Sequence, residues 1–172
     1  AESAQRLHVT VQMMRAALRQ FMRMGAPLKL DMARGFRFVQ LVSPLIEARE
    51  RLPLPVQAFW VTDSTNTRAL AALGAGLVRR KAWVADYQTQ GRGRAERRWH
   101  QGLGCGVSVS LAFPAHEALA LEALSLRVGL ALAEALQRVG VADVKLKWPN
   151  DIVWQGKKLG GILIEIRRTG VV

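Results

Sequence analysis

The chain has 172 residues, of which 50% are hydrophobic, and 25 lysines and arginines against 13 aspartates and glutamates give it a formal net charge of +12. A chain of this length and apolar content can bury a core, which excludes a wholly disordered protein. The excess of positive charge favours an anionic partner such as a nucleic acid, a phosphate or a nucleotide. The single cysteine excludes an internal disulfide and argues against a cysteine-ligated zinc site.

The sequence predicts neither a membrane span nor a secretion signal. Its longest stretch without a charged residue, Trp99 to His116, is broken by glycines and Pro114. The first residues lack the apolar segment of a signal peptide. We therefore expect a cytoplasmic protein with no membrane partner. Because the chain starts at Ala1 and residues 167–172 have the composition of a turn, we also expect a fragment of a longer protein.

The first part of the chain has the pattern of a helix followed by a hairpin. Apolar residues recur at helical spacing over residues 11–21, Thr10 is placed as the N-cap, and Gly25 ends the helix. Alternating apolar residues then predict two short strands within 28–38, around a turn at 34–35. This order is the outline of a winged helix-turn-helix.

The same part of the chain offers basic and polar side chains that suit contacts to a DNA groove and its phosphates. Another interpretation is an ordinary amphipathic helix with a solvated basic face, and His8 stands where a helix-turn-helix usually has its turn glycine. We expect residues 1–42 to form a winged helix-turn-helix without its first helix and the proline-bracketed residues 43–55 to form a linker. The candidate DNA-binding residues are Thr10, Gln12, Arg15, Arg19, Arg34 and Arg37.

The remainder, residues 56–172, alternates strands and helices unevenly, which predicts an α+β fold with a mixed sheet. A turn is expected at Gln155 and Gly156. The expected strands cover residues 56–61, 82–87, 107–113, 144–148 and 159–166, and the expected helices cover residues 66–73 and 119–139.

Four short motifs in this part could carry chemistry, although each alone also has an ordinary structural interpretation. Residues 63–66, Asp-Ser-Thr-Asn, lie at a strand-to-helix junction and could be a simple N-cap cluster. Residues 91–99 place arginines between glycines, which suits an anion but could be a solvated basic loop. Residues 145–151, Lys-Leu-Lys-Trp-Pro-Asn-Asp, could be a turn. Residues 157–162, Lys-Lys-Leu-Gly-Gly-Ile, could open a hairpin.

In this order the four motifs, with Gln88 ahead of the basic loop, resemble the biotin protein ligases, and the N-terminal part resembles the winged helix of the bifunctional ligase and biotin operon repressor. The resemblance covers essentially all 172 residues and stops before the family does. It implies that residues 56–172 are the N-terminal portion of a catalytic domain. It also implies ATP-dependent ligation of biotin to a lysine of a biotin carboxyl carrier domain through biotinyl-5′-AMP.

The resemblance also implies roles for individual residues. Arg94, Lys158 and Asp151 would be catalytic, with Lys158 near the biotin carboxylate and Asp151 positioning the incoming lysine. The implied residues that bind biotin and the adenylate are Ser64, Thr65, Asn66, Gln88, Gly91, Arg92, Gly93, Arg94, Trp99, Asn150, Lys158, Gly160 and Gly161. ATP with Mg²⁺ would be required and biotin would be the substrate. The partners would be the biotin carboxyl carrier protein of acetyl-CoA carboxylase, operator DNA and a second copy of the chain.

Three positions depart from the family pattern. Ala95 stands where the family has an arginine, and Glu96 and Gly106 stand where it has a glycine and an asparagine. We expect Glu96 to point outward and pair with a neighbouring arginine. Two other functions remain open: a regulator that senses biotinyl-adenylate without transferring biotin, and a lipoate-type acyl transferase on the same fold. No histidine or cysteine spacing predicts a protein-bound metal.

Overall fold

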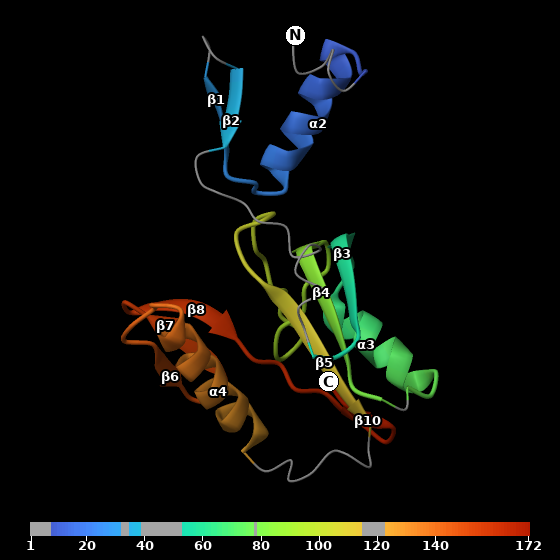
Figure 1. The fold of residues 1–172 in the computed structure, drawn as a ribbon, viewed down its shortest axis with the longest axis vertical. Coiled ribbons are helices and arrows are strands. Elements are labelled where there is room, and N and C mark those ends of the chain that lie inside the picture. The colour runs from blue at the N-terminus through green and yellow to red at the C-terminus, as the bar shows by residue number, and fades with distance from the viewer. Residues whose placement is uncertain (1–7, 32–34, 39–52, 78, 115–122) are drawn as a thin grey trace.

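A computed structural model describes residues 8–31, 35–38, 53–77, 79–114 and 123–172 (Figure 1). The expected wing residue Arg34 lies outside the described residues. So do most of the expected linker and the first residues of the helix expected at 119–139.

The N-terminal block consists of helix α2, Val11–Arg23, and a two-stranded hairpin. The Thr10 hydroxyl accepts a hydrogen bond from the Met13 amide at 3.1 Å, as an N-cap does. After the helix, Gly25 adopts a φ of +74°, which glycine adopts without strain. Strand β1, Leu28–Asp31, pairs antiparallel with β2, Gly35–Phe38. These elements confirm the expected helix and hairpin.

Five strands form the central sheet, in the order β3-β4-β5-β10-β9 (Figure 1). Helix α3, Thr65–Gly74, connects β3 to β4, which run parallel, and the other neighbouring strands of this sheet are antiparallel. The sheet is therefore mixed, as expected. Its strands are β3, Val56–Thr62, β4, Lys81–Gln88, β5, Ser108–Pro114, β9, Ile166–Arg167, and β10, Gly170–Val171.

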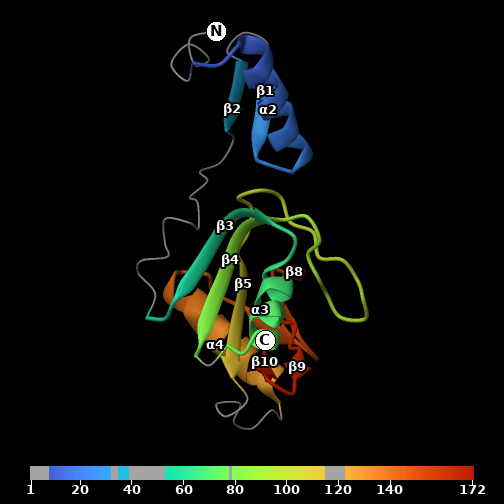
Figure 2. The same cartoon turned by 90° about the vertical axis from the view of Figure 1, so that its right-hand side faces the viewer.

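The core lies between α3 and this sheet, where Leu73 and Trp83 are almost completely buried. Ala69, Ala112 and Val172 complete the buried cluster. Helix α3 packs on β4 and β5 on one face of the sheet (Figure 2). Hydrogen bonds from Thr65 to Gln88 hold the start of the helix against the end of β4. The polar residues at these ends are consequently fixed in place.

A second sheet has three antiparallel strands in the order β6-β7-β8. They are β6, Lys145–Lys147, β7, Asp151–Trp154, and β8, Lys157–Gly161, and α4, Leu124–Arg138, contacts β6 and β7. The turn between β7 and β8 has positive φ at both Gln155 and Gly156, which confirms the expected turn.

One expectation about this sheet is wrong, and one of its strands was missed. A continuous strand over residues 159–166 is not formed, because β8 ends at Gly161 and the chain leaves this sheet to reach β9 in the central one. Strand β7 was not predicted, because the four residues of Asp151–Trp154 carry too short an alternation to stand out from a turn.

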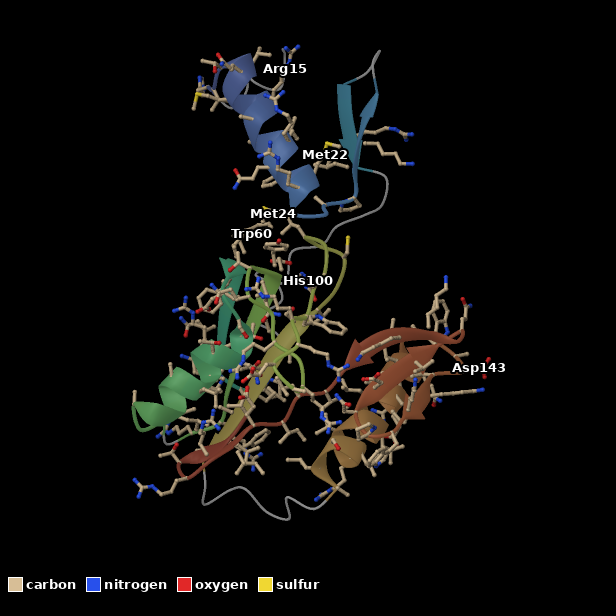
Figure 3. The ribbon with its side chains drawn as sticks, turned by 180° about the vertical axis from the view of Figure 1, so that it is seen from behind. Arg15, Met22, Met24, Trp60, His100 and Asp143 are labelled. Carbon is tan, nitrogen blue, oxygen red and sulfur yellow. The ribbon has the colours of Figure 1, made fainter. Side chains whose placement is uncertain are left out.

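The N-terminal block contacts the rest of the described chain through the end of α2. The Leu103 amide donates a hydrogen bond to the Met24 carbonyl at 2.9 Å, and a Cβ on Gly25 would lie 2.9 Å from the Cα of Gly102. Figure 3 shows Met24, Trp60 and His100 gathered at this junction. Within the described part of the chain, no helix is both long and apolar enough to span a membrane.

Candidate functional site

The polar residues at the start of α3 form a hydrogen-bonded amide cluster with β4 and β5. The carboxamide oxygen of Gln88 accepts bonds from the Thr65 amide at 2.7 Å and the Thr65 hydroxyl at 3.1 Å. The Ser110 hydroxyl lies 2.9 Å from Thr65 Oγ1 and 2.6 Å from Asn66 Oδ1. Of the candidate biotin-binding residues, Thr65, Asn66 and Gln88 are thus brought together, and Ser110 is one that the sequence analysis missed.

Ser64 sits beside this cluster as the N-cap of α3, and its side chain is almost completely buried. The preceding Asp63 carboxylate accepts a hydrogen bond from the Ser64 amide at 2.7 Å and pairs with the Arg68 guanidinium at 3.0 Å. Partial burial raises the pKa of Asp63. The hydrogen bonds from Ser64 and Thr62 and the charge of Arg68 outweigh it and lower the pKa below its usual 3.8.

Residues 91–98 form the arginine loop, which folds back on itself like a narrow hairpin. Arg92 and Arg98 form a bridge, the Gly93 amide donates to the Arg97 carbonyl at 2.7 Å, and the Trp99 amide donates to the Gly91 carbonyl at 2.9 Å. A Cβ on Gly91 would collide with the Trp99 carbonyl, so only glycine allows this approach.

The arginine loop contains two of the three departures from the family pattern, and both have left-handed backbones. Ala95 has a φ of +52° and Glu96 a φ of +58°, where a side chain is strained and glycine is not. Glu96 is exposed, as expected. The expected ion pair with a neighbouring arginine is not formed, because Glu96 pairs with no described residue.

Glu165 holds the arginine loop against α3. One of its carboxylate oxygens accepts from Arg92 at 2.9 Å, and the other accepts from the Asn66 side chain at 2.7 Å. Arg167 lies 3.7 Å from the same carboxylate. The sequence analysis missed Glu165, whose contacts with Arg92 and Asn66 span 73 and 99 residues and leave no local pattern.

The second sheet contributes two candidate catalytic residues, Lys158 and Asp151. The Lys158 ammonium on β8 donates to the Asp151 carboxylate on β7 at 2.6 Å and lies 5.4 Å from the centre of the Trp99 ring. A Cβ on Gly161 would touch the Lys158 ammonium at 3.4 Å, so this glycine leaves room for the lysine head group. Trp99 and Asp151 thus place Lys158 next to the arginine loop.

Arg94 joins the loop to the second sheet, because its guanidinium donates to the Asn150 carboxamide at 3.2 Å. Asn150 is fixed in turn, since it exchanges two hydrogen bonds with the backbone of Ile162, at 2.8 and 2.9 Å. Gly160 pairs with Ile152 in the register of β7 and β8, and a Cβ at this position would lie 4.0 Å from the Ile152 side chain.

A cavity of about 570 Å³ opens beside the arginine loop. Its walls come from residues 90–98, together with Thr67, Leu163 and Glu165. This volume lies in the range of small-molecule sites. Arg92, Arg94, Arg97 and Arg98 make the cavity strongly positive, which suits an anionic group such as a phosphate.

The described residues contain no group of three or more histidine, cysteine, aspartate or glutamate side chains that could hold a metal ion. Magnesium commonly binds through substrate phosphates with one or two carboxylates.

In the N-terminal block, the exposed face of α2 carries Gln12, Arg15 and Arg19, and Arg37 on β2 is exposed. Thr10 acts as the N-cap, as described above. His8 stands at the position where a helix-turn-helix usually has its turn glycine. Its φ is +51°, a left-handed backbone conformation that favours glycine.

The part of the chain that holds the mixed sheet, the amide cluster and the arginine loop is similar to known proteins. The sequence model of the Biotin/lipoate A/B protein ligase family matches residues 58–172. The chain therefore belongs to this family of ligases.

Two curated relatives and one solved structure illustrate the relationship. The bifunctional ligase/repressor BirA of Escherichia coli is 39% identical over 62% of this chain and 33% of its own length. The biotin--[acetyl-CoA-carboxylase] ligase of Paracoccus denitrificans is 41% identical over 63% of this chain and 46% of its own length. The biotin protein ligase of Aquifex aeolicus, solved with biotin and ATP, superposes with a TM-score of 0.60 at 34% identity, covering 68% of this chain and 49% of the other. The chain thus spans a third to a half of the length of these relatives.

Proposed function

We propose that this chain is part of a biotin protein ligase that forms biotinyl-5′-AMP and transfers biotin to a lysine of a biotin carboxyl carrier domain. The observation that carries the proposal is the convergence of three cations from one loop and one sheet. Arg92 and Arg94 of the arginine loop line the cavity, and Lys158 of the second sheet lies over the ring of Trp99, the residue that follows the loop. Relatives whose names record biotin ligation, and a related structure holding biotin and ATP, support it.

The proposed first step requires these cations. A carboxylate oxygen of biotin attacks the α-phosphorus of ATP, a P–O bond forms, and the bond to the leaving pyrophosphate breaks. Two anions must approach each other, so fixed positive charge lowers the barrier. In this structure the three cations are each held by an acceptor, Arg92 by Glu165, Arg94 by Asn150 and Lys158 by Asp151. A bound adenylate would take over these positive groups.

The amide cluster is the proposed biotin end of the site. Ureido groups present donors and acceptors that carboxamides and hydroxyls match. Ser64, Thr65 and Asn66 at the start of α3 and Gln88 at the end of β4 supply both kinds. In the second step the acceptor lysine nitrogen attacks the acyl carbon and AMP leaves. That nitrogen must lose a proton. The Asp151 carboxylate is the proposed group that holds the incoming amine, and its hydrogen bond from the Lys158 ammonium supports this role.

The test is incubation of the chain with ATP, Mg²⁺, an acceptor carboxyl carrier domain and either biotin or lipoate. Biotin on the acceptor lysine, with release of pyrophosphate, is the expected result. Transfer of lipoate instead would select the lipoate-type alternative within the same family. Release of pyrophosphate without transfer of biotin to the acceptor would favour the other alternative, a regulator that senses biotinyl-adenylate.

A second proposed function is DNA binding by the N-terminal block as a winged helix-turn-helix, with operator DNA as the partner and a homodimer as the binding form. Its support is the N-capped helix α2, whose exposed face carries Arg15 and Arg19, next to a hairpin with an exposed Arg37. The BirA relatives are named as repressors as well as ligases. We also propose that the protein acts in the cytoplasm.

A further inference from the structure

We propose that Gln101 is a positioning residue that fixes the orientation of the Gln88 carboxamide through Ser108; this inference rests on the proposed function, in which Gln88 binds biotin. Gln101 lies between the arginine loop and β5, outside every motif that the sequence analysis singled out.

The three side chains form a continuous chain of hydrogen bonds. The Gln88 nitrogen Nε2 donates to Ser108 Oγ at 3.1 Å, and the Ser108 hydroxyl donates to Gln101 Oε1 at 3.0 Å. Gln101 Nε2 in turn donates to the Gly106 carbonyl at 3.4 Å. Ser108 is buried, so its hydroxyl has few alternatives to these partners.

The direction of this chain follows from the number of protons. A serine hydroxyl has one proton, and Ser108 gives it to Gln101, so towards Gln88 it can only accept. Gln88 must therefore present its nitrogen to Ser108 and its oxygen to Thr65, as observed. Without Gln101 the Ser108 proton is free to turn, and the Gln88 carboxamide loses one of the two constraints on its orientation.

Gly106 is part of the same arrangement. A Cβ at this position would lie 3.3 Å from Gln101 Oε1, closer than most real Cβ contacts, and 3.5 Å from its Cδ, at ordinary van der Waals distance. The Gln101 carboxamide thus fills space that a side chain at 106 would enter. The family pattern has an asparagine where this chain has Gly106. In this chain the Gln101 side chain supplies a carboxamide beside that position.

The test uses the full chain and measures biotin binding by calorimetry, together with the KM values for biotin and ATP in biotin-dependent pyrophosphate release. Gln101→Met keeps the length of the side chain and removes both hydrogen bonds. We expect biotin affinity to fall about three- to tenfold, the effect of one internal hydrogen bond, while the KM for ATP stays unchanged. Gln57→Met, which removes a glutamine that bonds Lys81 on the far part of the sheet, should change neither value.

A double-mutant cycle separates positioning from a general loss of stability. Ser108→Ala removes the intermediate link, so adding Gln101→Met to it should cost little further affinity. Additive losses, an equal rise in both KM values, or unchanged biotin affinity in Gln101→Met would overturn the role of Gln101. Failure of the unmodified chain to bind biotin would instead overturn the proposed function, and this inference with it.

Discussion

The Lys158 ammonium donates a 2.6 Å hydrogen bond to the Asp151 carboxylate across neighbouring strands of the second sheet. The pair is partly exposed, so its own contribution to stability is small. Its importance is positional, because it holds a cation next to Trp99 at the edge of the arginine loop. The pair therefore connects the second sheet to the arginine loop in the proposed adenylate site.

We predict that Lys158→Ala lowers the rate of biotin-dependent pyrophosphate release by ~10²-fold or more, the usual cost of removing one charge-stabilising donor. Lys157→Ala is the matched control, since this neighbouring lysine is exposed and pairs with no described residue. An unchanged rate in Lys158→Ala, measured with a coupled pyrophosphate assay, would exclude Lys158 from the adenylation step.

Glu96→Gly should tighten binding of biotinyl-5′-AMP, but by less than about tenfold, or 1.4 kcal/mol. Glycine relieves the left-handed backbone at φ +58°, and the exposed carboxylate removed has no partner among the described residues. Calorimetry or Trp99 fluorescence measures the change. The control is Asp143→Gly, which relieves the same backbone strain at φ +58° away from the loop.

A gain of a hundredfold or more in Glu96→Gly, absent from Asp143→Gly, would contradict this account. It would show that the Glu96 carboxylate faces the phosphate and repels it.

The interactions of Asp63 predict a pH dependence of stability. Its pKa is lowered in the folded chain, so the stabilisation is present above the unfolded value and is lost as the pH falls through the folded one. Asp63→Asn should therefore reduce the free energy of unfolding by about 1 kcal/mol near pH 7, through loss of the bonds to Ser64 and Arg68. The difference from the unmodified chain should shrink as the pH falls through the lowered pKa of Asp63 in the folded chain.

Urea unfolding at several pH values measures this difference, with Asp143→Asn as an exposed control. A destabilisation of Asp63→Asn that stays constant down to low pH would show that the charge of Asp63 is not its cause.

The N-terminal block should bind duplex DNA with an affinity that falls steeply as salt is raised. Replacing both Arg15 and Arg19 by glutamine should weaken this binding and reduce the salt slope by about two units. Arg138→Gln, at the exposed end of α4, serves as the control. Fluorescence anisotropy with operator-length DNA measures the affinity at each salt concentration. An equal loss of affinity in both variants would show that the binding depends on net charge alone.

The sequence predicts the elements whose signal is local. Helix α2 has apolar spacing and a threonine cap, and the turn after β7 has a glycine where φ is positive, so both were correctly placed. Strand β7 was missed because four residues give too little pattern, and its pairing with β8 is decided by tertiary contacts.

The candidate site divides in the same way. Thr65, Gln88 and Lys158 belong to motifs with a recognisable order, and the structure brings each of them to hydrogen-bonded partners. Glu165 and Gln101 have no such motif, because their roles depend on partners that folding brings near: Arg92, 73 residues away, and a serine seven residues further along the chain.

The most direct test of the central claim is a crystal structure of the chain with biotinyl-5′-AMP. The account predicts that the phosphate lies against Arg94 and Lys158, which exchange Asn150 and Asp151 for it, and that the ureido group contacts the amide cluster at Gln88. A phosphate bound elsewhere, with the pairs of Arg94 and Lys158 intact, would contradict the proposed site.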